Sequence, residues 1–298
     1  MNRKPLKLGF ADTFSTAVNF FTEALGQRFH IIRDDENPDY LIYGEGVYGQ
    51  NHRRFGSEVT KIFYTGENVR PPWGECNFAM TFDHENSPRH YRLPLYVIDM
   101  WGAVTEGWTD DYYNIVGNPH DYEKDYDTRK FCSFVVSNPN QPMRNTAFKF
   151  INEYKPVASG GPHLNNIGSV LPRDKLQYKL HFMDDYRFNI CFENGSYPGY
   201  VTEKLYNALQ VKTMPIYWGS ATVDRDFNPR AFINASDHGD FNKLTDYVRH
   251  LDSKAGKQEY LDIISQPAFK NDIPNCYTSM ERSEEHTSEP SHITISYA

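Results

Sequence analysis

The chain has 298 residues, long enough for two domains of ordinary size that each bury their own core. Its formal net charge is −8, from 31 basic and 39 acidic side chains, which argues against nucleic acid as a partner and against a strong anchor on anionic lipid. The 21 Tyr and 20 Phe residues suit a core, and they also suit a surface that packs against the C–H face of a sugar.

The cysteines and the apolar runs exclude further classes. The four cysteines lie far apart and form neither a CxxC pair nor a Cys/His ligand spacing, so we expect no metal site and no disulfide framework. No apolar run approaches the roughly 18 residues of a membrane span, and the N-terminal stretch lacks the apolar centre of a signal peptide. We therefore expect a soluble, intracellular protein.

The first part of the chain predicts an open, parallel α/β sheet. A strand over residues 6–10 precedes a helix that ends near Gly26, and short strands are expected at 29–32, 40–43, 62–64 and 78–82. The strand at 62–64 leads directly into Thr65-Gly66-Glu67-Asn68, and ligands of such sheets bind beyond the carboxyl ends of the strands. Glu67 thus stands where a substrate would sit, although position alone favours a role in the turn that follows.

The segment from about residue 83 to 127 has no regular pattern. Arg92 and Tyr96 either line an acceptor site or support a domain interface. Trp101 is expected in a Gly-containing loop, where its indole would stack on a sugar or pack in the core. From about residue 112 to 130 we expect the connection between two domains.

A second α/β layer is expected from residue 131 onward. Its first strand ends in a loop, and Arg144 follows at the start of a helix, a position that suits an anion, although a surface ion pair is the simpler role. A strand over 188–192 is followed by a Gly-containing loop, a helix that starts at Thr202 and a further strand at 216–218.

The start of that helix is the most informative point of the sequence. A loop that feeds a helix N-terminus presents free backbone N–H groups and the positive end of the helix dipole, which favours phosphate. Glu203 can accept from sugar hydroxyls, and Lys204 can sit against a diphosphate. The alternative is an ordinary helix start, with Thr202 as the cap and Glu203 favoured by the dipole.

Five stretches of the sequence resemble the bacterial α-1,3/4-fucosyltransferases, which move fucose from GDP-fucose onto N-acetylglucosamine. They are Phe63–Asn68 (FYTGEN), Tyr91–Tyr96 (YRLPLY), Ser133–Asn145 (SFVVSNPNQPMRN), Phe188–Ser220 and Asp226–Asn234 (DFNPRAFIN). The resemblance implies an α/β fold of two Rossmann-like domains that face each other across a cleft (GT-B type). It implies an acceptor-binding domain over residues 1–128 and a GDP-fucose-binding domain over 129–280; residues 281–298 resemble nothing in the family and are expected to be a disordered or non-native tail.

The resemblance also implies roles for individual residues. Glu67 would be the general base of an inverting transfer, and Arg144 and Lys204 would neutralise the leaving diphosphate. Tyr200 would contact the donor, or would be a structural ring packed on Tyr197. The full set of donor-binding candidates is Arg144, Asn194, Tyr200, Glu203 and Lys204, and the acceptor-side candidates are Arg92, Tyr96 and Trp101.

The expected partners are GDP-fucose and an N-acetylglucosamine-containing oligosaccharide. The hydroxyl expected to receive the fucose is O3 of the N-acetylglucosamine. No metal or other cofactor is expected to be required, because no Asp-x-Asp element stands in a position expected to hold a metal, although a divalent ion could stimulate the reaction. The expected location is the bacterial cytoplasm, with peripheral contact to the inner membrane as an alternative. A glycosidase and a binding module that has lost catalysis are the competing functions.

Overall fold

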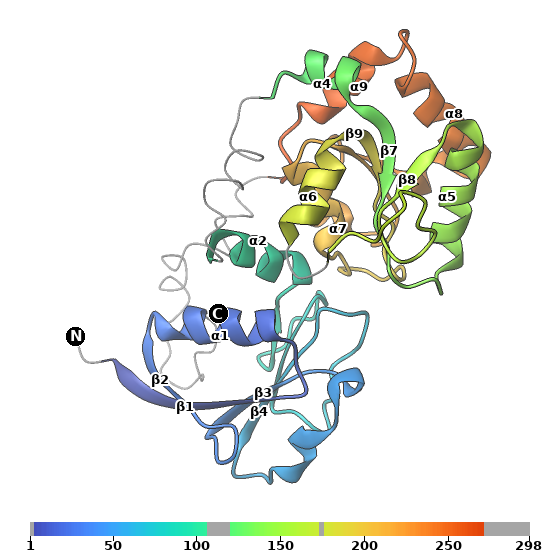
Figure 1. Ribbon diagram of the computed structural model, residues 1–298. Coiled ribbons are helices and arrows are strands. Elements are labelled where there is room, and N and C mark those ends of the chain that lie inside the picture. Colours follow the sequence, from blue (N-terminus) through green and yellow to red (C-terminus); the bar gives the residue numbers. More distant parts are fainter. Residues whose placement is uncertain (1–2, 106–119, 173–175, 271–298) are drawn as a thin grey trace. The chain divides into compact units, whose positions relative to one another are not determined.

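The computed structural model describes residues 3–105, 120–172 and 176–270, which form two compact units (Figure 1). The first unit contains the described residues up to 105, and the second contains those from 120 to 270. Each unit is a parallel β-sheet covered by helices, so the predicted α/β class is confirmed. Within the described ranges, no helix is both long and apolar enough to cross a membrane.

The first unit has a six-stranded sheet in which every strand pairs in parallel, in the order β2-β1-β3-β4-β5-β6. Its elements are β1 (Lys4–Ala11), α1 (Ser15–Gly26), β2 (Phe29–Arg33), β3 (Tyr40–Tyr43), η1 (Gly46–Tyr48), η2 (Asn51–Arg54), β4 (Thr60–Tyr64), β5 (Phe78–Thr81), β6 (His90–Arg92) and α2 (Leu95–Thr105). The strand order reverses direction between β1 and β3, which makes the carboxyl ends of these two strands the switch point of the sheet.

Helix α1 covers the sheet of the first unit through one apolar face. Phe20 and Phe21 of this helix are buried, and the Phe21 ring meets the Tyr64 ring of β4 edge-on, with 5.3 Å between centroids. Phe20 meets the ring of Trp101 at 5.2 Å and a right angle. Trp101 itself lies within helix α2, so its predicted place in a Gly-containing loop is wrong.

The second unit has a five-stranded parallel sheet in the order β11-β10-β9-β7-β8. Its elements are α4 (Tyr122–Thr128), β7 (Lys130–Phe134), α5 (Pro142–Tyr154), β8 (Val157–Ser159), α6 (Leu176–Asp184), β9 (Tyr186–Ile190), α7 (Glu203–Gln210), β10 (Met214–Tyr217), η3 (Val223–Arg225), β11 (Ile233–Asn234), η4 (Ala235–His238), α8 (Phe241–Leu251) and α9 (Lys257–Ile264). Helix α4 packs on α9 and lies in the segment for which the sequence indicated only a connection.

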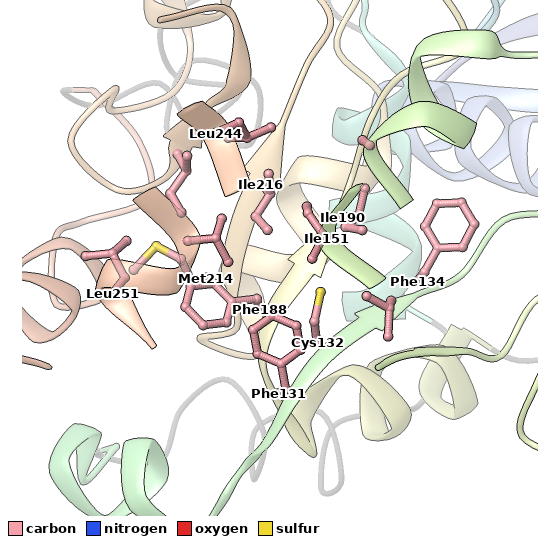
Figure 2. Packing of buried hydrophobic residues seen from close by; sticks show 14 of the residues in the cluster. Phe131, Cys132, Phe134, Ile151, Phe188, Ile190, Met214, Ile216, Leu244 and Leu251 are labelled. Atoms are coloured by element: carbon pink, nitrogen blue, oxygen red, sulfur yellow. The ribbon is translucent and has the colours of Figure 1, made fainter. Parts of the chain in front are cut away.

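The core of the second unit lies between its sheet and helices α5, α8 and α9. Figure 2 shows Phe131, Cys132, Phe188 and Met214 from three neighbouring strands packed together, and each of these side chains is at most 5% exposed. Full burial of one such side chain contributes roughly 1.5–3 kcal/mol, so this cluster accounts for much of the stability of the unit. Strands β7, β9 and β10 are buried on both faces, with α5 and α8 on one side and α6 and α7 on the other (Figure 1).

Candidate functional site

The sheet order of the second unit locates a ligand site without reference to side chains. The chain leaves β7 toward β8 and then returns to the other side of β7 as β9, so the order reverses between β7 and β9. In doubly wound sheets, ligands bind beyond the carboxyl ends of the strands at such a reversal. The loops that follow β7 and β9 therefore border the candidate site.

Arg144 connects these two loops. Its side chain is 1% exposed, and its Nε and Nη2 donate to the Phe192 carbonyl at 3.1 and 2.9 Å. Nη2 also donates to Asn194 Oδ1 at 2.6 Å, and Nη1 donates to the Asn138 carbonyl at 3.4 Å. The structure thus brings together Arg144 and Asn194, two of the predicted donor-binding residues, at the reversal of the sheet.

Thr202 begins helix α7 as the sequence predicts. It is the N-cap residue, and its side-chain oxygen accepts from the Lys204 backbone N–H. Its own backbone N–H and hydroxyl both donate to the carboxylate of Glu193, at 2.7 Å each. Because Glu193 is fully buried, this pair of hydrogen bonds fixes the position of the helix start.

Two ammonium groups and two carboxylates gather around this helix start. Lys204 Nζ lies 3.5 Å from Glu193 Oε2 and 3.6 Å from Glu203 Oε1, and it donates to Thr202 Oγ1 at 3.0 Å. Lys179 Nζ reaches the site from α6, at 3.4 Å from Glu203 Oε1 and 2.8 Å from Asn207 Oδ1. The side chains of Lys204, Lys179 and Glu203 are 18%, 20% and 23% exposed, so all three meet the solvent, whereas Glu193 does not.

The two carboxylates of the cluster differ in their pKa. Burial raises the pKa of Glu193 above its ordinary value, and the charge of Lys204 opposes this rise. Burial acts in the same direction on Glu203, but the charges of Lys204 and Lys179 outweigh it and hold the pKa of Glu203 at about 2. Glu203 is therefore ionised at neutral pH, beside the two ammonium groups.

The backbone N–H of Gly199 holds the loop before α7 against the loop after β10. Gly199 has a φ of 87°, and its N–H donates to Ser220 Oγ and Thr222 Oγ1 at 2.9 Å each. A Cβ on Gly219 would lie 2.5 Å from the Tyr217 hydroxyl and 2.6 Å from Glu193 Cγ, so no larger residue fits there. The Tyr200 side chain is fully buried within this arrangement.

The first unit holds Glu67, the predicted base. This residue follows β4, its side chain is exposed, and its backbone N–H donates to Thr65 Oγ1 at 3.0 Å. The Thr65 hydroxyl in turn donates to the carboxylate of Glu45, which follows the neighbouring strand β3. Glu45 was not identified from the sequence.

The acceptor-side candidates are occupied by contacts within the first unit. Arg92 Nε donates to the Phe82 carbonyl at 3.0 Å, Tyr96 is fully buried, and Trp101 packs edge-on against Phe20. These contacts are structural, and a role of the three residues in acceptor binding stays a prediction.

Comparison with known proteins identifies the family. A model of the N-terminal domain of alpha-(1,3)-fucosyltransferase FucT matches residues 7–99, and a model of the C-terminal part of glycosyltransferase family 10 (fucosyltransferase) matches residues 126–265. A crystal structure of an α1,3-fucosyltransferase superposes with a TM-score of 0.72 at 30% identity, over 89% of this chain and 82% of that one. The chain belongs to the α-1,3-fucosyltransferase family.

Two further fucosyltransferases of this family define the extent of the likeness. Alpha-(1,3)-fucosyltransferase FucT of Helicobacter pylori is 32% identical over 294 residues, which cover 87% of this chain and 59% of that protein. The chain therefore spans somewhat more than half the length of that relative. An α1,3-fucosyltransferase crystallised with GDP-fucose superposes with a TM-score of 0.69 at 29% identity, over 89% of this chain and 83% of that one.

Sequence reasoning missed three charged residues of these two candidate sites: Glu45, Lys179 and Glu193. Glu193 carried a local signal, since it lies shortly after the end of a buried strand of a parallel sheet, where ligand-side residues gather. Lys179 carried none, because only the packing of α6 on α7 brings it to Glu203. Among the residues that the structure describes, no group of three or more His, Cys, Asp or Glu side chains gathers in a way that could hold a metal ion.

Proposed function

We propose that this chain transfers L-fucose from GDP-fucose to O3 of N-acetylglucosamine in a lactosamine-type glycan, with inversion at the anomeric carbon. The observation that carries the proposal is the start of α7, where the buried Glu193 holds Thr202 in place and Lys204 lies in the first helical turn. A preorganised helix start beside a cation is suited to a diphosphate. The fold and family of the chain support the same conclusion.

The donor half of the proposal assigns the second unit, within residues 129–280, to GDP-fucose. Lys204 and the backbone N–H groups at the start of α7 would contact the diphosphate, and each charge-assisted hydrogen bond contributes roughly 1.5–3 kcal/mol. Arg144 would add its positive charge from the buried position at which it also orients Asn194. Glu203 and Tyr200 complete the proposed donor contacts, Glu203 through the hydroxyls of ribose or fucose.

The acceptor half of the proposal assigns the base to Glu67 in the first unit, within residues 1–128. The acceptor oxygen forms a bond to the anomeric carbon of fucose while the bond from that carbon to the GDP oxygen breaks, and GDP leaves with the electron pair. Glu67 takes the proton of the acceptor hydroxyl. The positive charges on the donor side stabilise the charge that develops on the departing diphosphate.

The experiment that tests this function is product analysis. The protein is incubated with GDP-fucose and either a type 1 or a type 2 lactosamine acceptor, and the linkage of any product is determined by NMR. We expect an α-fucosyl residue on O3 of the N-acetylglucosamine of the type 2 acceptor. If GDP raises the melting temperature but neither acceptor is fucosylated, the chain is a nucleotide-binding module and the proposal is wrong.

A further inference from the structure

The switch point of the first sheet lies beside a carboxylate that the proposed mechanism does not use. Strand order in the first unit reverses between β1 and β3, and Glu45 follows β3 after Gly44. Strand β4 is the parallel neighbour of β3, with Tyr43 paired to Phe63, and Thr65 and Glu67 follow β4. Glu45 and Glu67 therefore leave the same edge of the sheet from adjacent strands, on the side where ligands of such sheets bind.

A single hydroxyl links the two residues. Thr65 is 2% exposed, and its Oγ1 donates to Glu45 Oε2 while it accepts the backbone N–H of Glu67 at 3.0 Å. A hydroxyl has one hydrogen to donate and two lone pairs that accept. Once the carboxylate of Glu45 takes the hydrogen, the lone pairs of Thr65 are available to the Glu67 N–H.

From this arrangement we infer that Glu45 is a positioning residue for Glu67, which it holds in place through the hydroxyl of Thr65. The inference rests on the proposed function, because it gives Glu67 the role of the base. Glu45 is 9% exposed, and a carboxylate in such a place is costly unless its hydrogen bonds compensate for the lost water. The bond to Thr65 supplies such compensation, and the same bond directs the turn that carries Glu67.

The surroundings of Glu45 act on its own carboxyl group and on two neighbouring phenols. Burial raises the pKa of Glu45, the Thr65 hydroxyl lowers it, and the charge of Glu67 raises it. The phenols of Tyr48 and Tyr64 face the same two carboxylates: the pKa of each is raised by burial, then by Glu45 and then by Glu67.

The test compares Glu45→Ala with Glu45→Gln in the fucosyl-transfer reaction. Alanine removes the acceptor of the Thr65 hydrogen, so we expect kcat to fall about 10- to 100-fold with little change in the KM for GDP-fucose. Glutamine keeps an acceptor oxygen but removes the charge. We expect its kcat to stay within about threefold of the wild type, because the acceptor of the Thr65 hydrogen bond is kept.

Two controls separate positioning from folding. Glu23→Gln removes an exposed carboxylate of α1 in the same unit and should change neither kcat nor KM. Should Glu45→Ala fail to fold, Thr65→Val replaces it: the valine lacks the linking hydroxyl and should lower kcat as Glu45→Ala does, whereas Thr65→Ser should retain activity.

The outcomes distinguish this inference from the function on which it rests. Wild-type kcat in Glu45→Ala or Thr65→Val, or a kcat of Glu45→Gln as low as that of Glu45→Ala, would overturn the inference. An active wild type and an inactive Glu67→Gln would still support the function. Absence of fucosyl transfer by the wild type would overturn both.

Discussion

Glu193 accepts two hydrogen bonds from one residue, Thr202, whose backbone N–H and hydroxyl each lie 2.7 Å from a carboxylate oxygen. The carboxylate is fully buried, and the ammonium of Lys204 stands 3.5 Å away and offsets its charge. The start of α7 is therefore held in place by the protein itself. In the proposed function, this rigidity means that the diphosphate finds its binding groups already oriented.

Glu193→Gln should loosen this helix start. Glutamine has the size of glutamate, but its amide nitrogen cannot accept from Thr202, so one donor loses its partner. We expect a loss of about 1–3 kcal/mol in the free energy of unfolding and weaker GDP binding. Urea unfolding and calorimetric titration with GDP measure the two effects. Glu153→Gln, at an exposed position of α5, is the control, and equal stability of the two variants would contradict this account of Glu193.

Gly219→Ala should destabilise the same region by steric overlap. The new Cβ would stand 2.5 Å from the Tyr217 hydroxyl and 2.6 Å from Glu193 Cγ, both of them buried. Overpacking of this kind costs about 1–3 kcal/mol. Thermal unfolding should show a lower midpoint for this variant but not for Gly74→Ala, since a Cβ on Gly74 meets no atom within 4 Å. Identical midpoints would show that the loops around Gly219 can move to make room for a methyl group, and would contradict the predicted overlap.

Glu203 should make the stability of the second unit depend on acidic pH. Burial acts to raise its pKa, but Lys204 and Lys179 hold the folded-state pKa at about 2, below the ordinary value of 4.5. A folded-state pKa below the unfolded one adds stability that is present above about pH 4.5 and is lost as the pH falls toward 2. In urea unfolding at pH 5 and pH 3, Glu203→Gln should therefore lose less stability between the two pH values than the wild type. A loss as large as that of the wild type would argue against the ion pairs.

Fucosyl transfer should continue when divalent ions are removed. In the proposed mechanism, the positive charges of Lys204 and Arg144 take up the charge that develops on the departing diphosphate. We expect the rate in excess EDTA to stay within about threefold of the untreated rate, which on the scale of catalytic barriers is a difference of less than 1 kcal/mol. Complete loss of activity in EDTA, restored by a divalent ion, would show that a metal ion is required.

Local chemistry explains what the sequence predicted well. A Thr before a helix with Glu and Lys in its first turn is a cap pattern that depends on neighbouring residues alone, and Thr202 is the N-cap of α7. All four residues of β10 are apolar because both faces of this strand are buried, so it could be recognised without knowledge of the fold.

The wrong and missing predictions involve long-range contacts or a lost periodicity. In α2, consecutive residues Tyr96, Val97 and Ile98 are all buried, so the helix shows no polar face there and its period is hidden. This is why Trp101 was placed in a loop. For Arg144, a surface ion pair was the simpler alternative to an anion site, but the side chain is buried and bonds to the Phe192 carbonyl, 48 residues away, which no local pattern could indicate.

The division of roles between Lys204 and Glu67 is the central claim of this account, and calorimetric titration with GDP tests it directly. Lys204→Ala removes a charge-assisted contact to the diphosphate of roughly 1.5–3 kcal/mol, so we expect its Kd for GDP to rise by about 10- to 100-fold. Glu67→Gln should bind GDP as the wild type does, although it should no longer transfer fucose. Lys243→Ala, an exposed lysine of α8, is the control for loss of a positive charge. Equal loss of GDP affinity in Lys204→Ala and Glu67→Gln, or full affinity in Lys204→Ala, would contradict the claim.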